Sequence, residues 1–318
     1  MKEKFRVRTD LALEEREEIE LEDSELKGVI VEEKKNEQEN IRVIKLTITN
    51  EHGARLLHKP VGTYLTLEAP EMAESSEEYH REISCVLAEY LKDLIQPYWR
   101  EDGISILVVG LGNWEVTPDA LGPNVVNNIA IQRENEVDSQ KISISGIVPG
   151  VMAQTGMETA VIIKGVVRET KPDVVIAIDA LAARNSKRLN TTIQVTDTGI
   201  HPGSGVGNHR KAITKESIGT NVIAIGVPTV IDTPTIVYDT LENLLKALSV
   251  SKHFKAMSDT FRKFNDEEKY QLIREIINPE MSDMFVTPKD ADETIKRIGY
   301  TISEAINIAT DVEKEYLM

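Results

Sequence analysis

The chain has 318 residues, of which 41% are hydrophobic and 28% are charged, close to the values of an average globular protein. Its 53 acidic and 37 basic residues give a formal net charge of -16, which opposes sequence-independent binding to a nucleic-acid backbone. With one cysteine and no apolar run near the roughly 18 residues of a membrane span, the sequence predicts a cytoplasmic protein with no internal disulfide and no membrane or direct nucleic-acid partner.

The charge changes sign near residue 10. Residues 1–9 hold four basic residues and one acid, whereas residues 10–25 hold nine acids and one arginine. Taken alone, a charge run of this kind is typical of a solvated chain end.

Two early strands and one long helix come next. Residues 41–49 and 61–68 are rich in β-branched side chains and partly alternate, which predicts two strands that pair as a hairpin. Residues 76–95 predict a helix that begins at a serine-rich N-cap and stops before a proline. We expect Cys85 on the apolar face of this helix, as a core residue with no base nearby to activate its thiol.

The middle of the chain alternates between strand and helix patterns. Apolar runs at residues 104–109, 174–178 and 222–227 lack alternation, as expected of strands that are covered on both faces of a parallel sheet. Residues 158–169 have helical spacing, and a further helix is predicted to begin at Thr233 as N-cap with a proline at its first position. The order is that of βαβ units.

Two amphipathic helices, at residues 266–277 and 291–310, are predicted near the end of the chain. The fold class that follows is α/β, a mostly parallel twisted sheet with helices on both faces, of phosphorylase/hydrolase-like type. We expect an α/β catalytic domain over residues 11–250 and a helical appendage, residues 251–318, packed on it.

Candidate catalytic residues follow the apolar strands, because ligands of open α/β sheets bind beyond the carboxyl ends of the strands. Asp179 comes directly after the run 174–178, so its carboxylate is expected at that edge, and Asp119 lies on the long loop after the preceding strand. Two neighbouring carboxylates raise one pKa and so provide both an acid and a base, which is what activating water against an amide requires.

Each aspartate also has a structural interpretation, since aspartates commonly cap helices or bind backbone amides. Four other polar residues of the same segments are second-rank candidates for lining the site: Glu115, Asp197, His201 and Asp232. A metal site is not predicted by any His-Glu-x-x-His or paired-cysteine spacing, although Asp119, Asp179 and His201 are a conceivable ligand set that the fold would have to assemble.

Glycine-rich segments at residues 110–112 and 203–208 are weak nucleotide signals. Glu115 stands where the third glycine of the dinucleotide fingerprint belongs, and the second segment lacks the Gly-Lys-Ser/Thr of a P-loop. Ser204 is not in a Gly-x-Ser-x-Gly elbow. No cofactor is expected, and a serine or cysteine nucleophile is disfavoured.

Several long and unusual strings together resemble the germination protease family of spore-forming bacteria, over nearly the whole chain. Examples are Thr-Pro-Asp-Ala-Leu-Gly-Pro around Asp119 and Ile-Asp-Ala-Leu-Ala-Ala-Arg from residue 178. The segments that carry the resemblance are residues 7–12, 58–68, 110–123, 148–152, 177–184, 197–208 and 286–289.

The resemblance implies an endopeptidase with a fold similar to that of hydrogenase maturation proteases, no recognised cofactor and two essential aspartates, which are Asp119 and Asp179 here. Its substrates would be the small acid-soluble spore proteins of the spore core, cleaved after an acidic residue that precedes an apolar one. The resemblance also implies a homotetramer and a zymogen that cleaves itself between Asp10 and Leu11, so that residues 1–10 are a propeptide.

Three hypotheses remain open. The first is a protease in which one aspartate acts as general base and the other as acid or as the group that polarises the carbonyl. The second is a metal-dependent hydrolase that uses Asp119, Asp179 and His201. The third is a non-catalytic binding module for spore proteins.

Overall fold

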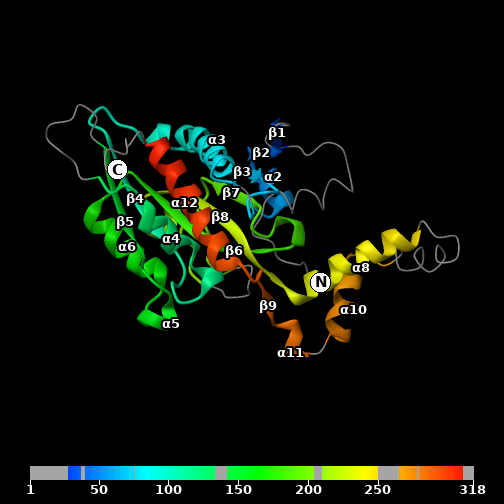
Figure 1. Ribbon diagram of the computed structural model, residues 1–318. Helices are drawn as coiled ribbons and strands as arrows, with labels where there is room; N and C mark the ends of the chain where they lie inside the picture. Colours follow the sequence, from blue (N-terminus) through cyan, green and yellow to red (C-terminus); the bar gives the residue numbers. More distant parts are fainter. Residues whose placement is uncertain are drawn as a thin grey trace.

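The computed structural model describes residues 28–36, 40–74, 76–132, 142–203, 210–249, 264, 266–277 and 279–310 (Figure 1). The strands are β1 (Val29–Asn36), β2 (Ile41–Ile48), β3 (Gly62–Glu68), β4 (Ile104–Gly110), β5 (Ile142–Ile147), β6 (Val174–Ala183), β7 (Thr192–Thr196), β8 (Asn221–Asp232) and β9 (Phe285–Val286). The α-helices are α2 (Glu51–Leu57), α3 (Glu77–Ile95), α4 (Leu121–Asn128), α5 (Met152–Thr155), α6 (Thr159–Thr170), α7 (Lys215–Ile218), α8 (Thr233–Ser249), α10 (Asp266–Ile276), α11 (Pro279–Ser282) and α12 (Ala291–Ala309).

The strands of the described residues form one sheet in the order β1-β2-β3-β7-β8-β6-β4-β5, with β9 paired to β8. Neighbours are parallel from β8 through β6 and β4 to β5, and antiparallel everywhere else. The α/β class is confirmed, but the expectation of a mostly parallel sheet is wrong. The reason is β7, a strand of five residues that the sequence analysis missed and that joins the β2–β3 pair to the edge of the parallel strands.

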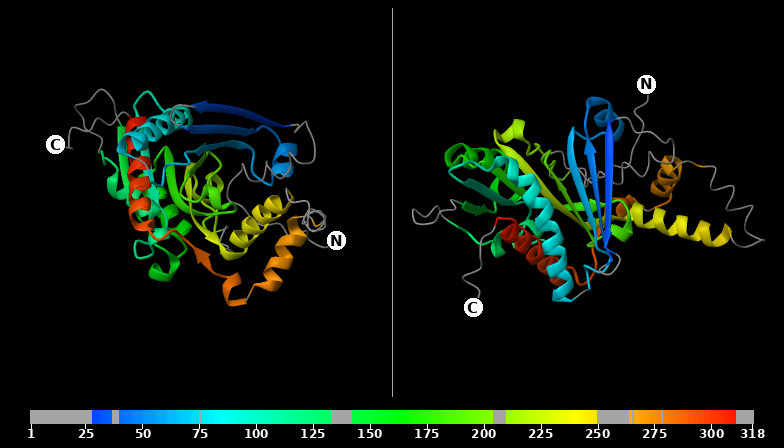
Figure 2. Two further views of the ribbon diagram at one scale, coloured as in Figure 1. Left: turned by 45° about the vertical axis from the view of Figure 1, so that its right-hand side comes forward. Right: turned by 90° about the horizontal axis from the view of Figure 1, so that it is seen from above.

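Helices cover both faces of the parallel strands, as expected. On one face, α3, α4 and α12 pack on alternate side chains of β4, β6 and β8, and on the other face α6 and α7 pack on the intervening ones. Figure 2 shows that β1 and β2 extend away from these helical layers. A small separate cluster, Leu46, Ile48, Leu57 and Tyr64, joins β2 and β3 to α2.

Most predicted elements agree with the structure to within a few residues. The strands at 41–49 and 61–68 are β2 and β3, which pair antiparallel with the short helix α2 between them. The expectation that Cys85 is a core residue is wrong, because it lies on the exposed side of α3. Of the two helices predicted near the end of the chain, α10 packs against α8 at the right of Figure 1, whereas α12 shares the main core with α3 and α4.

The domain division predicted near residue 250 falls in a stretch that the structure does not describe, residues 250–263, and it stays a prediction. Among the described residues, no helix is both long enough and apolar enough to cross a bilayer.

Candidate active site

Asp119 lies in a single 3₁₀ turn, Thr117–Asp119, between the end of β4 and the start of α4. Hydrogen bonds from three separate parts of the chain hold this turn. The hydroxyl of Thr229 in β8 donates to the Pro118 carbonyl over 2.7 Å, the Thr117 hydroxyl donates to Asp292 of α12, and the Asn113 amide donates to the Asp119 carbonyl over 3.1 Å. The turn is therefore fixed to the strands and to the last helix at once.

The glycines near this turn are explained by close packing. A Cβ atom on Gly110 would lie 2.3 Å from the carbonyl oxygen of Gly122, and one on Gly122 would lie 2.4 Å from the carbonyl oxygen of Leu111. Real Cβ atoms do not approach backbone this closely, so the two glycines let the first turn of α4 rest directly on the end of β4 and the middle of β6. Gly110, the first glycine of the segment that resembles a nucleotide loop, serves this contact.

The carboxyl group of Asp119 is half-buried, and this burial raises its pKa above the usual value of an aspartate. The positive charge of Arg210 and a hydrogen bond from the Asn113 backbone amide act in the opposite direction and offset part of the shift. Burial is the larger effect, so the group favours its protonated form more than an exposed aspartate does.

Asp179 is buried, with 5% of its surface exposed. The expectation that it ends its strand is wrong, because β6 continues to Ala183 alongside a long β8. On the other side, however, the ladder with β4 ends at the pair Gly110 and Ile178, so Asp179 is the first residue of β6 beyond β4. Its Oδ1 atom accepts a hydrogen bond of 3.0 Å from the amide of Ala180.

The two aspartates flank the same short stretch of backbone at the end of β4. The Leu111 amide donates to the Ile178 carbonyl over 2.8 Å, directly before Asp179. A Cβ atom on the next residue, Gly112, would lie 3.0 Å from Oδ1 of Asp119. The fold therefore brings the two segments together at the carboxyl end of β4, the kind of place where ligands of open sheets bind.

Asp197 and Asp232 have structural partners. Asp197 Oδ1 accepts a bond of 2.8 Å from the Thr63 amide, which fastens the end of β7 to the start of β3. Asp232, and not the predicted Thr233, caps α8, since its Oδ1 accepts from the Thr235 amide over 2.9 Å. Its Oδ2 accepts from the Tyr270 hydroxyl over 2.8 Å and ties α8 to α10.

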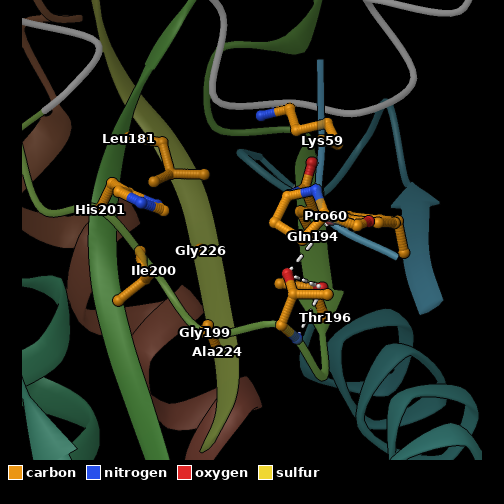
Figure 3. A pocket seen from close by; sticks show the side chains of 12 residues that line it. Lys59, Pro60, Leu181, Gln194, Thr196, Gly199, Ile200, His201, Ala224 and Gly226 are labelled. Carbon is orange, nitrogen blue, oxygen red and sulfur yellow. Dashed lines mark hydrogen bonds between the residues drawn. The ribbon is translucent and has the colours of Figure 1, made fainter. Parts of the chain in front are cut away.

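Glu115 and His201 are both exposed. Glu115 lies on the loop that precedes the Asp119 turn, and its amide donates to the Asn113 side chain over 3.0 Å. His201 lines a small hollow next to β8, on the side of the sheet that faces α6 and α7 (Figure 3).

The hollow has a volume of about 80 Å³, well below the roughly 300 Å³ of even a small ligand pocket. Among the residues that the structure describes, no three His, Cys, Asp or Glu side chains gather as metal ligands, so Asp119, Asp179 and His201 do not form the ligand set considered above. The candidate cleavage-site residues Asp10 and Leu11, and Ser204, lie outside the described residues.

Sequence reasoning missed Lys59, Tyr64 and Gln194, which line the same hollow as His201. Lys59 lies on the turn before β3, Tyr64 on β3 and Gln194 on β7. All three belong to the antiparallel part of the sheet, to which the rule about the carboxyl ends of parallel strands does not apply. The sequence does hold a signal for two of them, because Lys59 and Tyr64 lie in the segment 58–68, which carries part of the resemblance.

Comparison with known proteins gives a consistent result. A family model described as germination protease matches residues 7–263. A germination protease of Caldanaerobacter subterraneus subsp. tengcongensis is 46% identical over 310 residues, which cover 95% of this chain and 94% of the relative. Germination proteases of Clostridium tetani and Bacillus subtilis are 42% and 40% identical, covering 95% and 96% of this chain and 95% and 93% of the relatives.

Proposed function

This chain belongs to the germination protease family and is a peptidase, and we propose that it is the endopeptidase that begins the degradation of small acid-soluble spore proteins during germination. The proposal includes cleavage after an acidic residue that precedes an apolar one, and a place of action in the spore core. It also includes a homotetrameric assembly.

The observation that carries the proposed chemistry is the approach of the Asp119 and Asp179 segments to the end of β4. The Leu111 amide donates a hydrogen bond to the carbonyl of Ile178, the residue before Asp179, and Gly112 lies against the carboxyl group of Asp119. The hydrogen bonds from Thr229 and Thr117 hold the turn of Asp119 in place, which is the rigidity that a catalytic carboxyl group requires.

We assign the general base to Asp179 and the general acid to Asp119. Burial raises the pKa of Asp119, which favours a carboxyl group that holds a proton to donate. In the proposed step, the Asp179 carboxylate takes a proton from water while the water oxygen bonds to the peptide carbonyl carbon. Asp119 then protonates the leaving nitrogen as the C–N bond breaks, which yields a carboxylic acid and an amine.

The proposed zymogen rests on the string Thr9-Asp10-Leu11-Ala12, which has an acidic residue followed by an apolar one, at the point where the charge of the chain changes sign. Cleavage between Asp10 and Leu11 would remove a basic segment of ten residues and leave an acidic N-terminus. This step would let the chain process itself by the specificity that it applies to its substrates.

The test is mass spectrometry of a small acid-soluble spore protein after incubation with the full chain and with a chain that begins at Leu11. The same experiment includes Asp119→Ala and Asp179→Ala, with circular dichroism as a check of folding. We expect cuts after acidic residues, with excess substrate turned over, and a loss of about 10²-fold or more in rate for each folded variant.

A folded variant that keeps full activity would remove that aspartate from the mechanism. Stoichiometric binding with no cut would favour the binding module, and a loss of activity on exhaustive chelation, restored by a divalent ion, would favour the metal-dependent hydrolase. Release of residues 1–10 from the full chain, absent from both aspartate variants, is the expected sign of self-processing.

A further inference from the structure

The small hollow beside β8 lies next to Asp179. Gly226, which forms part of its wall, is the register partner of Asp179 in the ladder between β6 and β8. Leu181, another lining residue, is two positions beyond Asp179, and residues two apart on a strand face the same side of the sheet. The hollow and the Asp179 side chain therefore lie on the same face of the sheet, at neighbouring positions.

The size of the hollow fits a single side chain. Its volume of about 80 Å³ is several times smaller than that of a cofactor site. Its wall is mixed, with apolar contacts from Leu181 and Ile200 and polar ones from Gln194, Thr196 and Thr198.

Two basic side chains line the hollow. The described residues that line it include Lys59 and His201 but no carboxylate, although the whole chain carries a net charge of -16. In Figure 3 the amino group of Lys59 and the ring of His201 extend toward the space between them from opposite sides. An ammonium group and a ring N–H are both hydrogen-bond donors, which a carboxylate side chain can accept.

The backbone around Lys59 is well fixed. The amides of His58 and Lys59 both donate to the Ala54 carbonyl at the end of α2, where His58 has a left-handed conformation. One residue on, the Pro60 carbonyl accepts a bond of 2.8 Å from the Tyr64 hydroxyl, which also accepts from Thr198 over 3.2 Å. Burial raises the pKa of Tyr64 to about 12, so this hydroxyl keeps its proton at neutral pH.

We infer that the hollow is the specificity subsite for the acidic substrate residue whose carbonyl is attacked, with Lys59 as the charge partner of its carboxylate and His201 as a second donor. This inference rests on the proposed function, because it needs a peptide bond to be cut near Asp179. It adds the residues that select the acidic side chain and the place where that side chain lies.

The test uses the full chain, after the incubation described above, and two peptides that differ only in a central Glu-Leu or Gln-Leu pair. We expect the parent to cut the glutamate peptide with the higher kcat/KM. Lys59→Gln is expected to lower the ratio of the two kcat/KM values roughly tenfold, mainly through the glutamate peptide, because one charge-assisted hydrogen bond is lost. Lys59→Arg, which keeps the charge, is expected to retain most of the preference.

A matched control is Lys45→Gln on β2, which removes a positive charge from a surface ion pair with Glu32 and lies outside the hollow. It should leave the ratio unchanged, which separates a local contact from the general charge of the protein. An unchanged ratio in folded Lys59→Gln, or equal loss with both peptides, would overturn the subsite. Failure of the parent to cut either peptide would instead overturn the proposed function, and the subsite with it.

Discussion

The two halves of the sheet are built differently. In the parallel half, β5, β4, β6 and β8, helices cover both faces, and β6 is buried at nine of its ten positions. In the antiparallel half, β1, β2, β3 and β7, the edge strand β1 has no fully buried residue, and a small cluster with α2 covers part of one side. The parallel half supplies the candidate catalytic aspartates, and the antiparallel half supplies the turn that carries Lys59.

The halves meet at Gly226, which pairs with Asp179 of β6 on one side and with Gln194 of β7 on the other. The absence of a side chain at this position leaves room for the hollow, and a Cβ atom there would lie 2.5 Å from a methyl carbon of Leu181. The difference teaches that the half covered by helices on both faces can hold the candidate catalytic groups, while the thinner half lines the proposed subsite.

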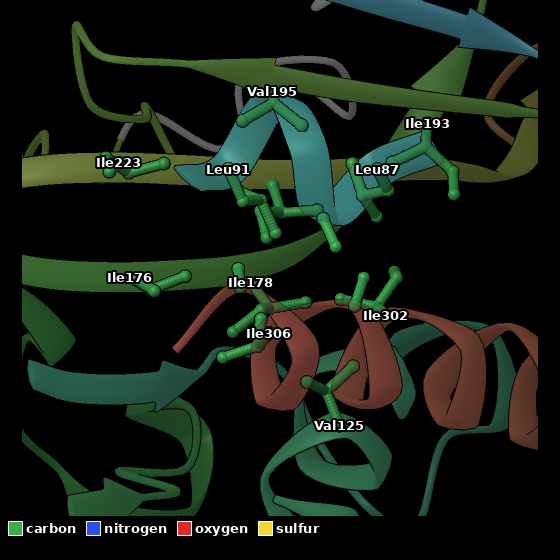
Figure 4. Packing of buried hydrophobic residues seen from close by; sticks show 14 of the residues in the cluster. Leu87, Leu91, Val125, Ile176, Ile178, Ile193, Val195, Ile223, Ile302 and Ile306 are labelled. Atoms are coloured by element: carbon green, nitrogen blue, oxygen red, sulfur yellow. The ribbon is translucent and has the colours of Figure 1, made fainter. Parts of the chain in front are cut away.

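The largest expected effect concerns the cores of the two halves. Ile302 of α12 is fully buried against α3, α4 and the strands (Figure 4), and Ile302→Ala should lower the free energy of unfolding by about 2–5 kcal/mol. Leu57→Ala removes an equally buried side chain from the small cluster near β2, where the surroundings can collapse more easily. We expect its cost near the lower end of that range.

Urea denaturation followed by two probes measures both effects. The first probe is tryptophan fluorescence, which reports the parallel half because Trp99 and Trp114 flank β4. The second is far-ultraviolet circular dichroism, which reports all helices and strands. Coincident transitions in both variants would mean that the halves unfold as one unit. A larger loss from Leu57→Ala than from Ile302→Ala would contradict the comparison.

A smaller effect is expected at the contact between α4 and the strand ends. Gly122→Ala places a Cβ atom 2.4 to 2.7 Å from backbone atoms of Leu111 and Ile178, which cannot move independently. We expect a loss of roughly 1–3 kcal/mol in stability, and a fall in kcat because the turn of Asp119 directly precedes this helix. Thermal unfolding and the peptide assay measure the two parts separately.

The matched control is Gly165→Ala in the exposed part of α6, where an added Cβ meets nothing within 4 Å. Because alanine favours a helix more than glycine does, this variant should be stabilised by up to about 1 kcal/mol, with activity unchanged. Equal behaviour of the two variants would show that α4 is free to shift, and that close packing does not fix the Asp119 turn.

The contrast between the halves also explains what the sequence could predict. Strands covered on both faces appear as apolar runs, so β4, β6 and β8 were identified, although the runs end before β6 and β8 do. Strand β1 was missed because its second half, Glu-Glu-Lys-Lys-Asn, is charged, as suits an exposed edge. Strand β7 alternates but has only five residues, and missing it made the sheet seem mostly parallel.

For the site, the rule that ligands bind at the carboxyl ends of parallel strands singled out Asp119 and Asp179, which the fold does bring to the end of β4. The same rule also selected Asp197 and Asp232, because a carboxylate that caps a helix and one that faces a substrate look alike in sequence. Only the hydrogen bonds to Thr63 and Thr235 distinguish them. The position of Lys59 beside the hollow depends on the long-range pairing between β3 and β7, which local sequence patterns do not encode.

The smallest expected effect concerns the stability that the folded protein loses by burying the Asp119 carboxyl in the parallel half. Since burial raises the pKa of this carboxyl in the folded protein, ionisation is easier in the unfolded chain. Stability therefore decreases as the pH rises from the usual aspartate pKa to the raised one, and the loss is complete above it. Asp119→Asn cannot ionise and keeps an oxygen to accept the Asn113 amide, so its melting temperature should exceed that of the parent at pH 7.

This gain should shrink as the pH falls through the raised pKa of Asp119, because the parent carboxyl then takes up a proton in the folded state. Melting temperatures of both proteins between pH 4 and pH 8 measure it, with Glu115→Gln as a control whose exposed carboxyl meets water in both states. If the gain in melting temperature stays constant with pH, its cause is packing and not ionisation. If the variant instead melts at a lower temperature than the parent at pH 7, Arg210 and the Asn113 amide outweigh burial in setting the pKa of Asp119. In that case the assignment of Asp119 as the acid would be reversed, and Asp179 would become the proton donor.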